Sequence, residues 1–135
     1  MAQPKRVTYF KAKITDTPGT LLGIAQTLKA RKIGLVALWG YSTQPGGAEL
    51  YCIPKDVEMF RSFAKASGMA IWEATGFLLK GTDRTGALVS TLDVLAKAGI
   101  NIVALHAMAA AGNYGAFLHV SDADVDKTAA AIGAR

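Results

Sequence analysis

The first part of the chain alternates between apolar and polar residues. Between Val7 and Thr15, one face carries apolar side chains such as Phe10 and Ile14, whereas Lys11 and Lys13 lie on the other face. A period of two residues predicts a β-strand with one buried face. The chain therefore opens on a half-buried strand.

The spacing of apolar residues then changes to that of a helix. Asp16-Thr17-Pro18-Gly19 places a capping side chain before a proline, which is typical of a helix start. The apolar residues that follow at helical spacing, and so predict a helix, are Leu21, Leu22, Ile24, Ala25 and Leu28. Further along, the pattern predicts strands at 33–41 and 49–53, a helix at 55–67 that buries Val57, Phe60, Phe63 and Ala64, and a short strand at 69–73.

The chain repeats itself at an offset of 67 residues. Without a gap, this offset aligns Thr8–Gly68 with Thr75–Arg135, and the identical pairs include Phe10/Phe77 and Asp16/Asp83. The matches gather at turns and at apolar positions, which two copies of one fold explain. The second copy predicts a strand at 75–82, a helix at 86–98, strands at 100–108 and 114–120, and a helix at 124–132.

Each copy has the order β-α-β-β-α-β, the split βαβ arrangement of ferredoxin-like folds. We therefore predict an α+β protein of two tandem units with antiparallel sheets, at residues 1–73 and 74–135. The second copy stops before its last strand, which leaves a sheet edge that something should cover. Because the strands Leu35–Trp39 and Ile102–Leu105 are apolar on both faces, we expect both faces to be buried by sheet packing, within the chain or in a homodimer.

The turns after the first strand of each copy resemble the opening motif of ACT domains. In copy one this is Asp16-Thr17-Pro18-Gly19-Thr20-Leu21; in copy two it is Asp83-Arg84-Thr85-Gly86-Ala87-Leu88, followed by Gly99-Ile100-Asn101-Ile102. The resemblance covers nearly the whole chain. It implies a small-molecule sensing module, usually for amino acids, whose units pair and hold the ligand between them.

The resemblance gives a set of candidate ligand-binding residues. They are Asp16, Thr17, Pro18, Gly19, Thr20, Leu21, Asp83, Arg84, Thr85, Gly86, Ala87, Leu88 and Asn101. Copy one has Gly34 where copy two has Asn101, so the second turn is favoured. A glycine at a helix start lets a carboxylate approach backbone N–H groups, and the nearby Asp can face its ammonium. The alternative is that each Asp only caps its helix.

Composition and charge narrow the functional classes. The chain has 135 residues, of which 51% are hydrophobic, and a single cysteine, so neither intrinsic disorder nor a disulfide scaffold fits. No apolar signal core follows the first charges, and we expect a cytoplasmic protein. The uncharged stretch from Ala98 to Ser121 is long enough to span a bilayer, but its Gly112-Asn113 pair indicates a hairpin.

No catalytic or metal-binding arrangement emerges from the sequence. His106 and His119 fall on predicted strands at apolar positions, matching Trp39 and Cys52 at the 67-residue offset, and have no nucleophile motif beside them. The run Asp122-Ala123-Asp124-Val125-Asp126 lacks the glycine and the closing glutamate of a calcium loop, and it favours a helix start instead. We therefore expect no enzymatic activity, no cofactor and no metal.

The leading functional hypothesis is a stand-alone regulatory protein that binds an amino acid and controls a separate metabolic enzyme or regulator. One alternative is a structural or interaction module without a ligand. Another is an RNA-binding ferredoxin-like protein, because residues 1–68 carry ten Lys/Arg against four Asp/Glu and Tyr9 or Tyr51 could stack on bases. The aromatic-rich signature of RNA recognition motifs is absent, which makes nucleic acid the weaker alternative.

Overall fold

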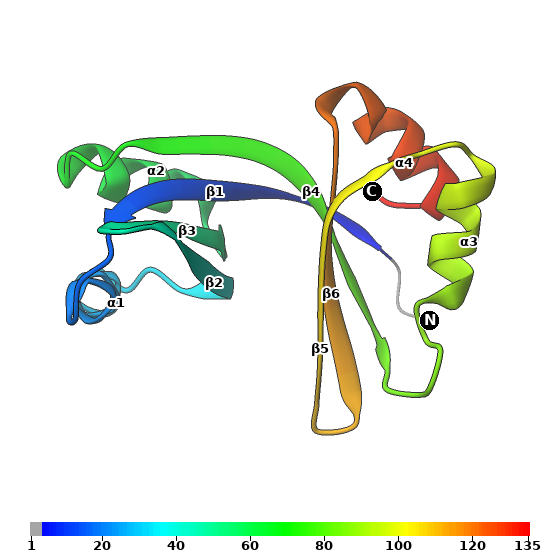
Figure 1. Cartoon of the computed structure of the whole chain (residues 1–135), viewed down its shortest axis with the longest axis horizontal. Helices are drawn as coiled ribbons and strands as arrows, with labels where there is room; N and C mark the ends of the chain where they lie inside the picture. The colour runs from blue at the N-terminus through cyan, green and yellow to red at the C-terminus, as the bar shows by residue number, and fades with distance from the viewer. Residues whose placement is uncertain (1–3) are drawn as a thin grey trace. The chain divides into compact units, whose positions relative to one another are not determined.

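The computed structural model describes residues 4–135 and confirms an α+β fold (Figure 1). Its elements are β1 (Lys5–Thr15), α1 (Thr20–Ala30), β2 (Leu35–Gln44), β3 (Gly47–Pro54), α2 (Val57–Ala66), β4 (Ile71–Thr82), α3 (Val89–Lys97), β5 (Ile102–Ala110), β6 (Asn113–Val120), a 3-10 turn η1 (Asp122–Asp124) and α4 (Val125–Ile132). The predicted order β-α-β-β-α is therefore present twice.

The chain forms two compact units. The first unit is Thr8–Ala74, with the strand order β2-β3-β1-β4; the second unit is Thr75–Arg135 together with the described residues before Thr8, with the order β5-β6-β4-β1. Within the units, β3 pairs antiparallel with β1 and β2, and β6 pairs antiparallel with β4 and β5. The antiparallel pairing is as predicted, but the six strands form one sheet in the order β2-β3-β1-β4-β6-β5 rather than a separate sheet for each unit.

The start of β1 completes the second unit. Among the described residues no strand follows α4, as the sequence indicates. Instead, the Arg6 N–H donates to the Arg135 carbonyl at 3.0 Å, and the Arg6 guanidinium lies 3.0 Å from the Asp126 carboxylate. Residues 5–7 thus belong to the second unit rather than to residues 1–73, and they cover the edge that the missing strand would leave open.

The two strands predicted at 69–73 and 75–82 form one strand. β4 runs without a break from Ile71 to Thr82. The segment that joins the two predicted strands, Glu73-Ala74-Thr75, contains no glycine or proline that would turn the chain. The first four residues of β4 belong to the first unit, and the remainder belongs to the second unit.

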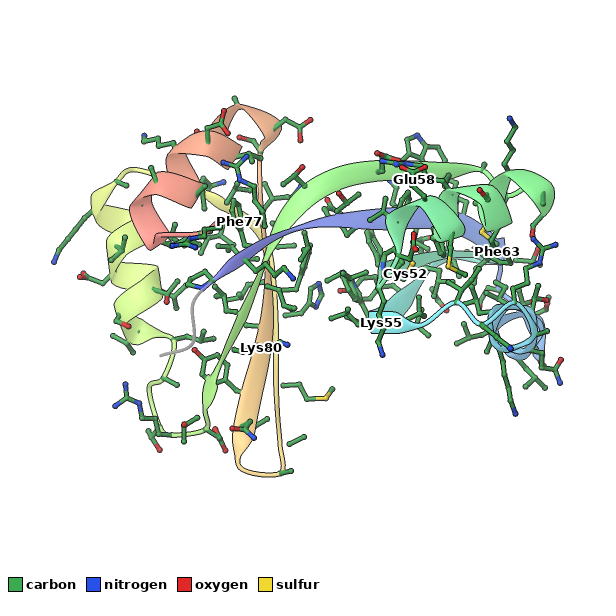
Figure 2. All side chains as sticks on the ribbon, turned by 180° about the vertical axis from the view of Figure 1, so that it is seen from behind. Cys52, Lys55, Glu58, Phe63, Phe77 and Lys80 are labelled. Carbon is green, nitrogen blue, oxygen red and sulfur yellow. The ribbon has the colours of Figure 1, made fainter. Side chains whose placement is uncertain are left out.

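Each unit has its own hydrophobic core. In the first unit Phe10 and Cys52 of the sheet pack with Phe60 and Phe63 of α2 and with Leu28 of α1; Figure 2 labels Cys52 and Phe63. The matching core of the second unit contains Phe77, Leu95, Leu118, Val120 and Ala129. In that unit α3 and α4 lie on the same side of the strands (Figure 1).

Several apolar side chains of α1, β2 and β5 are exposed in the single chain. Leu21 and Leu22 are 47% and 61% exposed, because they lie in the first turn of α1, beyond the core that Ile24 and Leu28 contact. The apolar residues of the two edge strands are also exposed: Val36 and Leu38 on β2, and Val103 and Met108 on β5. Both strands lie at the ends of the strand order, and burial of these side chains in a homodimer stays a prediction.

The strand registers show that the repeat contains a one-residue gap. The offset is 67 between Phe10 and Phe77, but 66 between their β-partners Cys52 and Leu118. The extra residue of the first unit lies at a register shift between Ser42 and Gln44, near the β2–β3 turn. In the second unit β5 and β6 meet in a tight hairpin, which confirms the predicted hairpin. Its turn residues are Ala111 and Gly112, both with positive φ, one residue earlier than the predicted Gly112-Asn113 pair, because Asn113 already pairs with Ala110.

The gap corrects one predicted equivalence. His119 pairs with Ala104 as Ile53 pairs with Ala37, so His119 matches Ile53 rather than Cys52. A separate finding concerns membranes: none of the described helices has the length and hydrophobicity needed to cross a bilayer.

Candidate functional site

The first candidate loop connects β1 with α1, and its polar side chains are engaged with one another. The Ser42 hydroxyl donates to the Asp16 carboxylate at 2.7 Å, and the hydroxyl oxygens of Thr17 and Thr20 are 2.8 Å apart. α1 begins at Thr20, after Gly19 with φ of 88°, and has no side-chain cap. The expectation that Asp16 and Pro18 start the helix is therefore wrong, because the turn closed by Thr20 N–H to Thr17 C=O comes first.

The second candidate loop, between β4 and α3, has a similar backbone but open side chains. Gly86 has φ of 76°, and α3 begins at Val89, three residues later than predicted, because residues 85–88 form a turn with Val89 N–H bonded to Gly86 C=O. Asp83 and Arg84 are exposed, and neither side chain has a hydrogen bond or ion pair with another residue in the described part of the chain. Their charges are available to a ligand.

An open groove of about 420 Å³ lies beside this second loop. It is lined by Gly81, Thr82, Arg84, Ala87, Ser90 and Tyr114. Lys80, labelled in Figure 2, lies on the stretch of β4 that leads to it. Arg84 and Ala87 belong to the predicted site, but the other four residues were not predicted. The pairing of Gly81 with Tyr114 across β4 and β6 brings Tyr114 to the groove.

Asn101 lies away from the second loop within one chain. It precedes β5 at the end where Ile102 pairs with Val120, whereas the loop follows the opposite end of β4, where Thr82 pairs with Asn113. In Figure 1 the chain enters β5 at the top of the view, and the β4–α3 loop lies at the bottom. At about 3.3 Å per residue, eight residues of strand separate them by roughly 25 Å.

The cysteine and one of the two histidines have pKa values that burial shifts. His106 faces Phe117, with ring centroids 6.5 Å apart, and burial lowers the pKa of His119 below its usual value. Burial raises the pKa of the Cys52 thiol to about 12, so it is protonated at neutral pH. In residues 4–135 no three His, Cys, Asp or Glu side chains gather as a metal site would require.

The rings considered for base stacking are already packed. Tyr9 is 6% exposed, so its ring cannot receive a base. The Tyr51 ring stacks on Trp39 at 5.5 Å, and its hydroxyl donates to the Glu49 carboxylate at 2.6 Å. A stacking platform for RNA needs exposed rings, and these two tyrosines do not supply it.

The fold places the chain in a structural class. No protein-family model matches the sequence, and no curated protein matches it either. Solved structures do match over nearly the whole chain, and the likeness confirms the predicted fold of two tandem ACT-type units.

Three of these structures define the likeness. Protein BT0572 from Bacteroides thetaiotaomicron is 17% identical with a TM-score of 0.84, over 98% of this chain and 90% of its own. The ligand-free regulatory subunit of aspartate kinase from Thermus thermophilus is 13% identical with a TM-score of 0.61, over 96% and 91%. That from Thermus flavus is 13% identical with a TM-score of 0.60, over 98% and 95%.

Proposed function

We propose that this protein is a regulatory protein that binds a small ligand, an amino acid, through its ACT-type units and controls a separate metabolic enzyme. The observation that carries the proposal is the open groove beside the second loop, on a fold that resembles regulatory subunits. The aspartate kinase proteins from the two Thermus species are named as regulatory subunits, which supports a regulatory role.

The second loop suits the two charged ends of an amino acid. The turn at Gly86 has no Cβ, so a carboxylate can approach the N–H groups at the start of α3, where the helix dipole favours an anion. Arg84 adds a full positive charge beside the groove, and Asp83 can receive the ammonium group. The first loop is a weaker candidate because the Asp16 carboxylate already accepts a bond from Ser42.

The proposal includes a homodimer. Val36 and Leu38 on β2, and Val103 and Met108 on β5, expose apolar surface in the single chain, and burying it against a second copy would be favourable. A dimer would also explain Asn101: because it lies roughly 25 Å from its own loop, it can reach a ligand only at the loop of a second copy. We therefore assign Asn101 to the site through the partner.

A thermal-shift screen of the purified protein against the twenty common L-amino acids tests the ligand proposal. We expect one or a few of them to raise the melting temperature in a concentration-dependent way. If none does so at millimolar concentration, the protein is an interaction module without an amino-acid ligand. Sedimentation velocity at micromolar concentration tests the dimer, and a species of about 14 kDa, the mass of one chain, would contradict it.

The assignment of Asn101 has its own test. Asn101→Ala should weaken the affinity for the amino acid about fivefold to tenfold, the effect of one lost hydrogen bond, while the melting temperature of the free protein stays the same. An unchanged affinity in a protein that is dimeric by sedimentation would remove Asn101 from the site.

A further inference from the structure

The groove of the second unit depends on an exchange of large and small residues between two strands. In the first unit Ile14 of β1 pairs with Ala48 of β3; at the matching place in the second unit Gly81 of β4 pairs with Tyr114 of β6. The large residue thus changes strand, and it changes from an aliphatic side chain to one that carries a hydroxyl. The first unit has no polar group at this position.

Gly81 is required for the position of the Tyr114 ring. A Cβ at residue 81 would lie 2.5 Å from Cε1 of Tyr114 and 3.1 Å from its hydroxyl oxygen. The ring therefore crosses directly over the glycine, where any side chain would displace it. This placement leaves Tyr114 only 9% exposed, packed with Leu79 and Ala116.

The ring of Tyr114 is buried, and its hydroxyl borders the groove. Tyr114 lines the groove together with Thr82, Arg84 and Ser90, and its hydroxyl makes no hydrogen bond to another residue within 4–135. A hydroxyl that donates to a carboxylate makes a charge-assisted hydrogen bond, which is stronger than a bond between two neutral groups. A hydroxyl held in this way, beside an unpaired Arg84, is arranged for an acceptor that comes from outside the chain.

We propose that Tyr114 is a specificity-determining residue of the second unit, whose hydroxyl donates to a carboxylate oxygen of the ligand while Arg84 supplies the opposite charge. The ligand class is a small carboxylate, and identifying it as an amino acid rests on the function proposed above. A neutral ligand of the same shape is bound weakly, because it leaves the Arg84 charge uncompensated. The first unit, with Ile14 and Ala48, binds no carboxylate at the matching position.

The decisive variant is Tyr114→Phe, with Tyr41→Phe as its matched control on β2 of the first unit. Tyr114→Phe keeps the ring over Gly81 and removes only the hydroxyl, so a structural role would lower the melting temperature and a binding role would not. The probes for isothermal titration are the twenty L-amino acids, the methyl ester of any amino acid that binds, and acetate, succinate and 2-oxoglutarate.

We expect Tyr114→Phe to weaken the best-binding carboxylate about tenfold or more, with an unchanged melting temperature, and Tyr41→Phe to leave the affinity unchanged. The methyl ester should bind at least tenfold more weakly than the free acid. A plain carboxylate that depends on Tyr114 when no amino acid binds would support this inference and refute the amino-acid function.

Two results would overturn the inference. An amino acid that binds the wild type and Tyr114→Phe equally would leave the proposed function standing and remove Tyr114 from the site. No binding by any of the probes would refute both the inference and the function.

Discussion

The two β–α loops share a backbone but differ in what their side chains do. Both place a left-handed glycine, Gly19 or Gly86, before the helix. In the first loop the Asp16 carboxylate accepts a hydrogen bond from Ser42. In the second unit Ala109 stands at the position that corresponds to Ser42, so the matching Asp83 has no side-chain partner among the described residues. The two copies of the repeat therefore share the backbone geometry of this loop, but only the second loop has an aspartate whose carboxylate is unbonded among the described residues.

The same contrast holds on the strands beside the loops. The first unit has the apolar pair Ile14 and Ala48, and the second has Gly81 and Tyr114. In the part of the chain that the structure describes, the open groove of the second unit is bordered by the unpaired Arg84 and by the Tyr114 hydroxyl. We therefore expect substitutions in the two cores to lower the free energy of unfolding equally. Substitutions in the two loops should differ in their effect on ligand affinity.

The largest effects should come from the cores and should be alike in both units. Phe10 and Phe77 occupy matching positions and are 1% and 0% exposed. Phe10→Ala and Phe77→Ala should each lower the free energy of unfolding by about 3–5 kcal/mol, because each removes a buried ring and leaves a cavity. Urea denaturation measures both. A cost below about 1 kcal/mol at either position would show that its core is not closely packed.

The next effect separates the loops by binding. Asp83→Ala should weaken amino-acid binding by about 1.5–3 kcal/mol, roughly tenfold to a hundredfold, because it removes a charge-assisted contact. Asp16→Ala should leave binding unchanged and lose only the surface bond to Ser42. Titration calorimetry compares the two variants. Equal losses would show that both loops bind, and unchanged affinity in both would place the site elsewhere.

Local patterns along the chain predict most of this fold. The alternation around Phe10 and the helical spacing up to Leu28 depend on neighbouring residues, and so does the hairpin at Gly112. The 67-residue repeat then extends these elements to the second half, including the absence of a strand after α4. The repeat also predicts the position of the second candidate loop, because Asp83 and Gly86 match Asp16 and Gly19.

Non-local pairings are the part that local patterns do not predict. Arg6 contacts Arg135 and Asp126 because β1 lies beside β4 in the sheet. No short sequence motif predicts this strand order. The one-residue gap near Ser42 changes the offset between the two copies for the whole of the following strand. The sequence contains an indication of this gap, because identical pairs at the 67-residue offset nearly end at Leu38. Gly81 and Tyr114 become a pair only once that register is known.

The third prediction tests whether the two glycines have the same backbone role and different binding roles. Gly19→Ala and Gly86→Ala should each cost about 1–2 kcal/mol of stability, because an L-residue is strained at positive φ. Around Gly19 a Cβ meets nothing within 4 Å, and at Gly86 it meets only Val89 at 3.5 Å, so crowding adds little. Only Gly86→Ala, or the bulkier Gly86→Val, should also abolish ligand binding. Binding that survives Gly86→Val would exclude close approach of the ligand to this turn.

The smallest expected effect is a pH dependence confined to the second unit. His119 stands where the first unit has Ile53, and burial lowers its pKa, an effect that the nearby Asp122 partly opposes. The folded state binds the His119 proton less readily than the unfolded state does. This residue therefore contributes stability above the unfolded pKa, near 6.5, and that contribution is lost as the pH falls through the folded pKa.

Melting temperatures measured from pH 7.5 to pH 5 should therefore fall less steeply for His119→Ile than for the wild type. His106→Phe is the control, because it replaces the other histidine of the chain, which packs against Phe117 in the same unit, and it should keep the wild-type slope. If His119→Ile also keeps that slope, the acid sensitivity comes from other groups and the two units do not differ in this respect.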